Sequence, residues 1–234
     1  MRLPIRTDSP AVDGYWTPGA VVRRVAEVLR EQGVRMLVAK VVGELVYRRY
    51  VLYEFSLDRQ APTTAARVPL EYGLLTDADV DEYLAFRHGA TADEVRARLA
   101  TGHRCFLARA RGEIVHARWY ATDRVFFFGL GYEVAAAPGS VIGYSALTAP
   151  EARGRGIAPA ARVHALEALR ADGYTREFAV VDPANRPAVR VVEKVGYRCV
   201  GSLGVLRLGS RRRPFVRLVE GALPAGAAPF PSRR

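Results

Sequence analysis

A glycine-rich turn carries the clearest chemical signal in the chain. It spans residues 147–158, Leu-Thr-Ala-Pro-Glu-Ala-Arg-Gly-Arg-Gly-Ile-Ala, between a strand-like run and an amphipathic helical run. Gly154 and Gly156 let the backbone approach a ligand closely, and the first turn of the following helix offers unpaired N–H groups at the positive end of its dipole. Arg153 and Arg155 add positive charge. This combination indicates a site for a pyrophosphate group.

The turn is not diagnostic by itself. It matches neither G-x-G-x-x-G nor a Walker loop, because no Gly-Lys-Ser/Thr follows it. An ordinary strand-to-helix turn with solvated arginines is the structural alternative for this segment alone.

A second segment makes the signal more specific. Residues 185–197 read Asn-Arg-Pro-Ala-Val-Arg-Val-Val-Glu-Lys-Val-Gly-Tyr. Residues 153–158 and this segment together resemble two motifs of the GNAT superfamily of N-acetyltransferases, the pyrophosphate loop Gln/Arg-x-x-Gly-x-Gly/Ala and the segment Asn-x-x-Ala…Glu-Lys-x-Gly-Phe/Tyr. They occur in the order of that family, with a helix and a strand between them. The resemblance covers residues 67–220.

The resemblance implies acetyl-CoA as the acyl donor. It places the pyrophosphate on backbone amides, the pantetheine beside a strand, and an asparagine near the pantetheine arm. The residues at these positions are Arg153, Gly154, Arg155, Gly156, Ile157 and Ala158 for the pyrophosphate, Ala146, Leu147 and Thr148 for the strand, and Asn185 for the arm. In the family this strand splays from the next one, here Phe178–Val181, and the thioester lies in the gap.

The implied reaction is the transfer of an acetyl group to a primary amine. A neutral amine attacks the thioester carbonyl, a backbone N–H of residues 146–148 stabilises the oxyanion, and the thiolate leaves. A base must take the proton of the amine, and an acid can protonate the sulfur.

The residues that usually move these protons are missing. Val192 stands where many members of the family have a tyrosine, and the strand 141–149 has no glutamate. Tyr144, Ser145 and Glu133 are therefore the catalytic candidates, with His116 and Tyr120 as further ones. For Tyr144 and Ser145 the alternative is a hydroxyl satisfied within the sheet, and for His116 it is a histidine without a chemical role.

The elements around these residues alternate in a way that predicts an α/β (α+β) domain. The resemblance further implies a mixed, mostly antiparallel twisted sheet flanked by helices. We expect strands at residues 68–75, 105–110, 114–121, 125–130, 141–149, 178–181, 200–208 and 215–219. We expect helices from Asp77 or Asp79 to Phe86, after the capping box of Thr91 and Glu94, and at residues 156–171 and 186–195. The aromatic run 126–128 is expected in the core.

Three regions follow along the chain. Residues 1–65 form an N-terminal extension with helical spacing at 21–29, although the mixed period of residues 36–57 fits a helix, a strand or one running into the other. Residues 66–220 form the acyltransferase domain, and residues 221–234 form a disordered tail. For the extension we keep three roles open: a homodimerisation arm, a lid over the acceptor site, and a helix that contacts a membrane surface.

The composition narrows the class of protein. Of 35 basic residues in the 234, only Lys40 and Lys194 are lysine, so the net charge of +11 reflects an arginine-rich composition typical of a GC-rich genome. No nucleic-acid-binding motif accompanies this charge, which disfavours a nucleic-acid partner. Cys105 and Cys199 have no disulfide or metal-ligand spacing, and no signal peptide or membrane span is visible. We therefore expect a cytoplasmic enzyme.

Two other functions compete with the enzyme. One is a regulatory module of the same fold that binds CoA without turnover. The other is a basic protein that binds nucleic acid or a membrane surface. Aminoacyl transfer on the same fold is not separable from acetyl transfer by sequence.

Overall fold

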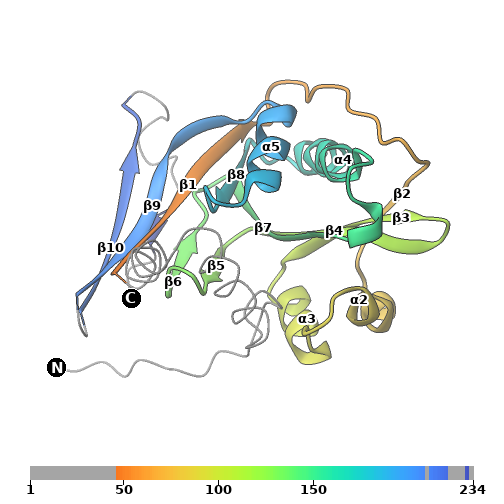
Figure 1. Ribbon diagram of the computed structural model, residues 1–234, viewed down its shortest axis with the longest axis horizontal. Coiled ribbons are helices and arrows are strands. Elements are labelled where there is room, and N and C mark those ends of the chain that lie inside the picture. The colour runs from red at the N-terminus through yellow and green to blue at the C-terminus, as the bar shows by residue number, and fades with distance from the viewer. Residues whose placement is uncertain (1–45, 209–210, 221–229, 232–234) are drawn as a thin grey trace, which may run out of the picture.

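A large twisted sheet dominates the fold (Figure 1). A computed structural model of the chain describes residues 46–208, 211–220 and 230–231. The sheet has eight strands in the order β10-β9-β1-β8-β7-β4-β3-β2. Its strands are β1 (Tyr47–Ser56), β2 (Glu71–Leu74), β3 (Arg104–Ala110), β4 (Glu113–Ala121), β7 (Ser140–Thr148), β8 (Arg176–Val181), β9 (Arg198–Leu208) and β10 (Arg211–Leu218). Only β7 and β8 pair in parallel, so the sheet is mixed and mostly antiparallel, as expected.

A second, smaller sheet and four α-helices complete the described structure. The small sheet has the order β11-β6-β5. Its strands are β5 (Arg124–Phe127), β6 (Tyr132–Ala135) and β11 (Phe230–Pro231). The helices are α2 (Val80–Phe86), α3 (Ala92–Ala100), α4 (Ile157–Ala171) and α5 (Arg186–Val195), with 3-10 turns η1 (Asp77–Asp79) and η2 (Pro150–Ala152). None of the helices among the described residues is long and apolar enough to cross a membrane.

Local signals explain several of these elements. The Thr91 side chain accepts from the N–H of Glu94, and the Glu94 carboxylate accepts from the N–H of Thr91, so the expected capping box starts α3. Arg111 and Gly112 both adopt positive φ in the turn that joins β3 to β4, so the strands expected at 105–110 and 114–121 form a hairpin. Gly196 ends α5 in the left-handed conformation.

The two faces of the large sheet are covered differently. Helices α4 and α5 cover one face, where Leu166 and Val192 pack against strand residues such as Phe55. On the other face, α2 and α3 pack on β3 and β4 around Trp119. The small sheet packs beside them on that same face, around Leu52 and other strand residues. Any site between β7 and β8 therefore has a different neighbourhood on each face.

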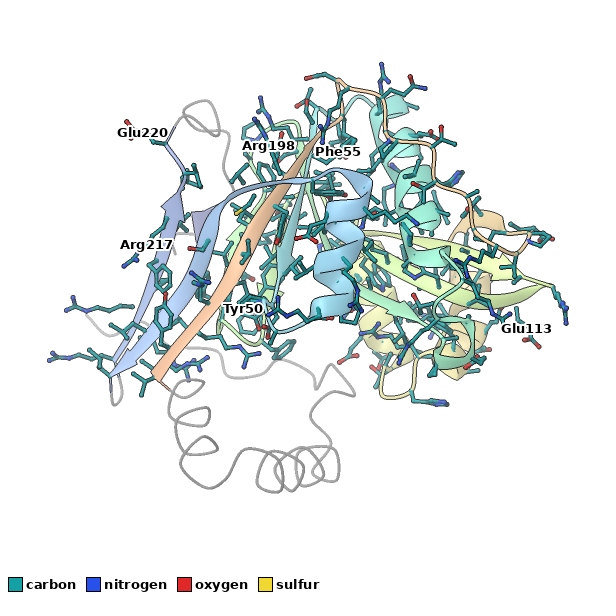
Figure 2. The ribbon with its side chains drawn as sticks, turned by 45° about the horizontal axis from the view of Figure 1, so that its top comes forward. Tyr50, Phe55, Glu113, Arg198, Arg217 and Glu220 are labelled. Carbon is teal, nitrogen blue, oxygen red and sulfur yellow. The ribbon has the colours of Figure 1, made fainter. Side chains whose placement is uncertain are left out.

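The most N-terminal described strand lies inside the sheet. β1 pairs antiparallel with β8 on one side and with β9 on the other, from Tyr47 to Ser56 (Figure 2). This differs from the helical extension expected for residues 1–65, because these residues alternate between the two covered faces, with Leu52 and Phe55 both buried. Residues 1–45, and with them the expected helix at 21–29, lie outside the described residues.

Two further expectations need correction. Phe126 and Phe128 are exposed and stack edge to face on each other, so the aromatic run is not wholly in the core. It belongs to the small sheet, one side of which faces away from the core. Phe230 and Pro231, within the tail expected to be disordered, pair with Ala135 and Val134 of β6.

Candidate functional site

The parallel pair of β7 and β8 ends in a fork. β7 and β8 pair from Ser140 and Arg176 up to Gly143 and Ala179. Beyond that point β7 continues to Thr148 paired only with β4 on its other side. The edge of β7 that faces β8 therefore carries backbone N–H and C=O groups outside the ladder, which can bond a ligand.

A β-bulge lies where β7 leaves β8. The register between β4 and β7 shifts between Ala117 and Trp119, which leaves one extra residue on β7. Ser145 lies in this bulge with a φ of 52°, one of two non-glycine residues with positive φ in the described chain. Its carbonyl accepts from Nη1 of Arg87 at 3.3 Å. A bulge reorients the backbone locally, and such bulges are frequent beside active sites.

The glycine-rich turn follows the end of β7. Gly154 and Gly156 have φ of 77° and 76°, which only glycine adopts readily. A Cβ on Gly154 would have no atom within 4 Å, so this turn has open space beside it, whereas a Cβ on Gly156 would lie 3.1 Å from the carbonyl oxygen of Ala65. Arg153 donates from Nε to the carbonyl of Thr148 at 3.3 Å.

Helix α4 begins directly after this turn. Gly156 is its N-cap, no side chain caps the helix, and its first turn contains no acidic residue. The N–H groups of Ile157 and Ala158 have no intrahelical acceptor, and the helix dipole is positive here. The residues expected to bind a pyrophosphate are thus brought together in one turn with the properties of an anion site.

Asn185 has a structural role in the chain as it stands. It is the N-cap of α5, and its Oδ1 accepts from the N–H of Ala188 at 3.2 Å. The helix that it caps packs beside α4 on the same face of the sheet. The cap thus uses the oxygen of Asn185, one of its hydrogen-bonding groups.

A buried ion pair lies at the base of the fork. Nη2 of Arg118 donates to Oε1 of Glu177 at 2.7 Å, and the two side chains are 6% and 0% exposed. The pair crosses Gly143, because a Cβ there would lie 2.1 Å from Arg118 and 2.2 Å from Glu177. Tyr120 is buried beside this pair, and burial raises its pKa. Tyr120 is therefore a neutral phenol of the interior.

His116 lies on the same side of β4 as Arg118. Its Nδ1 is 2.8 Å from Oγ1 of Thr148, and the ring is buried. Burial, together with the charges of Arg118 and Arg162, lowers the pKa of His116 to about 3. The ring is thus neutral at physiological pH and joins β4 to the end of β7.

The three catalytic candidates lie in different surroundings. Tyr144 is the first residue of β7 beyond the fork, and its hydroxyl is 2.6 Å from Nδ1 of His103. The Oγ of Ser145 is buried without a hydrogen-bond partner among the described residues. Glu133 lies on β6 in the small sheet, with its carboxylate 3.9 Å from Nη1 of Arg124.

Sequence reasoning missed His103. It follows Gly102 in the turn between α3 and β3, where no periodic pattern marks it. Its partner Tyr144 is 41 positions away in the chain, so only the pairing of β3, β4 and β7 brings the two together.

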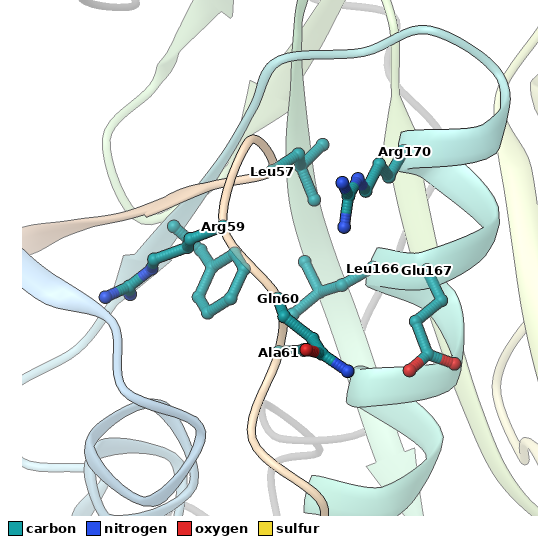
Figure 3. Close-up of a pocket in the computed structure, with 8 residues that line it drawn as sticks. Leu57, Arg59, Gln60, Ala61, Leu166, Glu167 and Arg170 are labelled. Atoms are coloured by element: carbon teal, nitrogen blue, oxygen red, sulfur yellow. The ribbon is translucent and has the colours of Figure 1, made fainter.

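A hollow lies away from the fork. It has a volume of about 150 Å³ and lies between the segment after β1 and the C-terminal half of α4 (Figure 3). Its lining residues are Phe55, Leu57, Arg59, Gln60, Ala61, Leu166, Glu167 and Arg170. None of the residues singled out by sequence lies in it.

Comparisons with known proteins identify a family. The sequence model of the acetyltransferase (GNAT) family matches residues 75–197, more than half of the chain. No curated protein matches. The region of the family match begins after β1, so that strand lies outside it although it is central to the sheet.

Solved structures show similarity at low sequence identity. A GCN5-related N-acetyltransferase from Sphaerobacter thermophilus has a TM-score of 0.51 and 13% identity, over 81% of this chain and 59% of that one. An N-acetyltransferase from Staphylococcus aureus Mu50 has a TM-score of 0.42 and 16% identity, over 54% of this chain and 81% of that one. A GCN5-related N-acetyltransferase from Kribbella flavida has a TM-score of 0.41 and 16% identity, over 72% and 60%.

Proposed function

Because the chain belongs to the acetyltransferase (GNAT) family, we propose that it transfers the acetyl group of acetyl-CoA to a primary amine. Family and fold support acyl-CoA-dependent acetyl transfer in general. The amine acceptor, the donor contacts and the mechanism are the parts that we propose here.

The observation that carries the proposal is the fork joined to an anion site. The turn 153–158 and the N-terminus of α4 offer amide groups and arginines to the pyrophosphate. From there the pantetheine runs back along Ala146–Thr148, whose groups facing β8 lie outside the ladder. Its amides take the bonds that a further strand would take. This path ends at the bulge, where the thioester then lies.

The chemistry is a direct attack. The lone pair of the neutral amine forms the new C–N bond at the thioester carbonyl, and the C–S bond breaks as CoA leaves as a thiolate. A backbone N–H of residues 146–148, reoriented by the bulge at Ser145, stabilises the oxyanion. The donor enters on the α4 side, so the opposite face of the fork is left to the acceptor.

A second function has a specific observation in its favour. Val192 lies fully buried in α5, at the position where many relatives have a tyrosine that donates a proton. A chain that binds CoA without turnover would need no such group. The experiment below separates the two functions.

The test measures the release of free CoA thiol. The purified chain is incubated with acetyl-CoA and a panel of small primary amines, amino sugars and peptides with free amino groups, with the matching alcohols as controls. We expect release only with an amine, and mass spectrometry of the acceptor then finds the acetyl group on nitrogen. Release with alcohols alone would contradict the amine acceptor. Binding of acetyl-CoA with no release for any acceptor would favour the regulatory module.

A further inference from the structure

A tyrosine and a histidine meet beside the fork, on the face away from α4. Gly143 faces α4 and leaves room for the pair of Arg118 and Glu177, so the next residue of β7, Tyr144, faces the opposite side. There its hydroxyl lies 2.6 Å from Nδ1 of His103, and the two rings are edge to face at 5.6 Å.

Neighbouring groups fix both rings. The Trp119 ring lies 6.5 Å from that of Tyr144, and the guanidinium of Arg98 lies 5.7 Å from the same ring. The backbone of Arg124 acts on His103 in the direction that favours the protonated ring. Nδ1 of His103 faces the hydroxyl of Tyr144, and in the tautomer that carries its proton on Nε2 this nitrogen accepts from the hydroxyl.

Burial keeps both members of the pair neutral. Burial and the charge of Arg98 lower the pKa of His103, while the backbone of Arg124 and the carboxylate of Asp123 oppose this. Burial raises the pKa of Tyr144, with Cys105 and Tyr83 acting in the same direction and the charges of Arg98 and Arg87 opposing. At neutral pH a neutral imidazole thus lies beside a protonated hydroxyl. In this arrangement the imidazole can act as a base by accepting a proton through the hydroxyl.

We propose that Tyr144 and His103 form the proton relay of the acyl transfer. This rests on the proposed function. As the amine nitrogen bonds to the acyl carbon, its proton passes to the oxygen of Tyr144, and the proton of Tyr144 passes to Nδ1 of His103. The thiolate leaves with the electrons of the C–S bond, and the imidazolium later returns its proton to solvent. Tyr144 is the group that touches the acceptor, and His103 acts through it.

The relay supplies a proton acceptor in a chain that has Val192 in α5 and no glutamate on β7. The other candidates are less well placed. Glu133 lies on the small sheet, with its carboxylate against Arg124, and His116 lies on the α4 face beside Thr148.

The test compares the rates of Tyr144→Phe, His103→Asn and the double variant between pH 5 and 9. Asparagine keeps an acceptor at the position of Nδ1 but does not titrate, and His88→Asn is the control for loss of a histidine outside the relay. A weakly basic amine is used as acceptor, so that the titration of the acceptor does not mask that of the enzyme. Calorimetry with acetyl-CoA and thermal unfolding check that donor binding and folding are kept.

We expect Tyr144→Phe to lower kcat by about 100-fold or more. In the wild type and in His88→Asn the rate falls as the pH drops through the lowered pKa of His103, because the base is then protonated. In His103→Asn this acid limb of the pH profile is lost. The double variant is no slower than Tyr144→Phe, since the two residues act as one unit. An unchanged acid limb in His103→Asn, or additive losses, would overturn the relay alone. A wild type that transfers to no amine would overturn the proposed function and the relay with it.

Discussion

At the scale of single residues, the base of the fork depends on Gly143, because a glycine has no side chain to occupy the space of its neighbours. The buried ion pair of Arg118 and Glu177 passes over Gly143, and any Cβ at that position would overlap both side chains. Both charges are desolvated, so each depends on the other for compensation. Gly143 is also the last residue of β7 that pairs with β8, so the ion pair lies where the strands separate.

Replacing Gly143 by alanine is therefore expected to be costly. The new methyl group displaces the pair, and we expect the free energy of unfolding to fall by about 3 kcal/mol or more, as when a buried ion pair is broken. Gly73→Ala is the matched control, because Gly73 also lies in a strand and a Cβ there would meet no atom within 4 Å. Urea denaturation compares the two. Equal stability of both variants would show that the pair does not need the space at Gly143.

The residues of the site could be predicted from sequence only where they are adjacent in the chain. The turn 153–158 and the helix after it form a local unit, and the pattern of glycines and arginines predicts an anion site there without knowledge of the fold. The environment of Tyr144 was not predictable, because its partner His103 comes from a distant turn. The bulge at Ser145 also has no signal in the sequence, since it arises from a register shift between β4 and β7.

At the scale of elements, β1 is the notable strand of the fold. It precedes the region matched by the family model, yet it lies between β8 and β9 and pairs with both. Glu54 of this strand is buried and accepts from Nε of Arg198 at 2.7 Å. β1 thus supplies part of the core and supports the strand that forms one arm of the fork.

A mutation in the core of β1 should therefore lower the stability of the whole domain, which should still unfold in one transition. Leu52 is fully buried between the large and small sheets, and we expect Leu52→Ala to lower the free energy of unfolding by about 2–5 kcal/mol in one cooperative transition. Leu208→Ala, at the end of β9, serves as the control, because this leucine is 55% exposed and should change stability by less than about 0.5 kcal/mol. Circular dichroism during thermal unfolding gives both values. Two separate transitions, or no loss for Leu52→Ala, would contradict the place of β1 in the sheet.

Local rules predicted most of the elements but not how distant ones combine. The bounds expected for α5 are those observed, and the hairpin of β3 and β4 follows from its turn residues. The mixed period at residues 36–57 left β1 open between helix and strand, because a strand buried on both faces lacks simple alternation. The separation of β5 from the large sheet arises from tertiary packing, which a single sequence does not encode as a period.

At the scale of the whole molecule, the two faces of the sheet have different tasks. The α4 face carries the turn 153–158 that we propose for the donor, and the opposite face carries Tyr144, on the side that we propose for the acceptor. The fork lies between the two. The net charge of +11 creates a positive potential around the protein, which favours the approach of an anionic donor. The homodimer and the membrane contact expected of residues 1–65 stay predictions, and residues 1–45 of that extension lie outside the described residues.

The most direct test of the account is a calorimetric titration with acetyl-CoA of the wild type, Gly154→Glu and Gly173→Glu. Gly154 and Gly173 have φ of 77° and 88°, a Cβ at either meets no atom within 4 Å, and they lie beyond opposite ends of α4. The two variants therefore carry the same strain and the same added charge, but only Gly154→Glu places a carboxylate at the pyrophosphate site. We expect the wild type and Gly173→Glu to bind alike and Gly154→Glu to bind at least tenfold more weakly, a loss of about 1.4 kcal/mol or more. Equal binding by all three, or no binding by the folded wild type, would contradict the assignment of this turn to the donor.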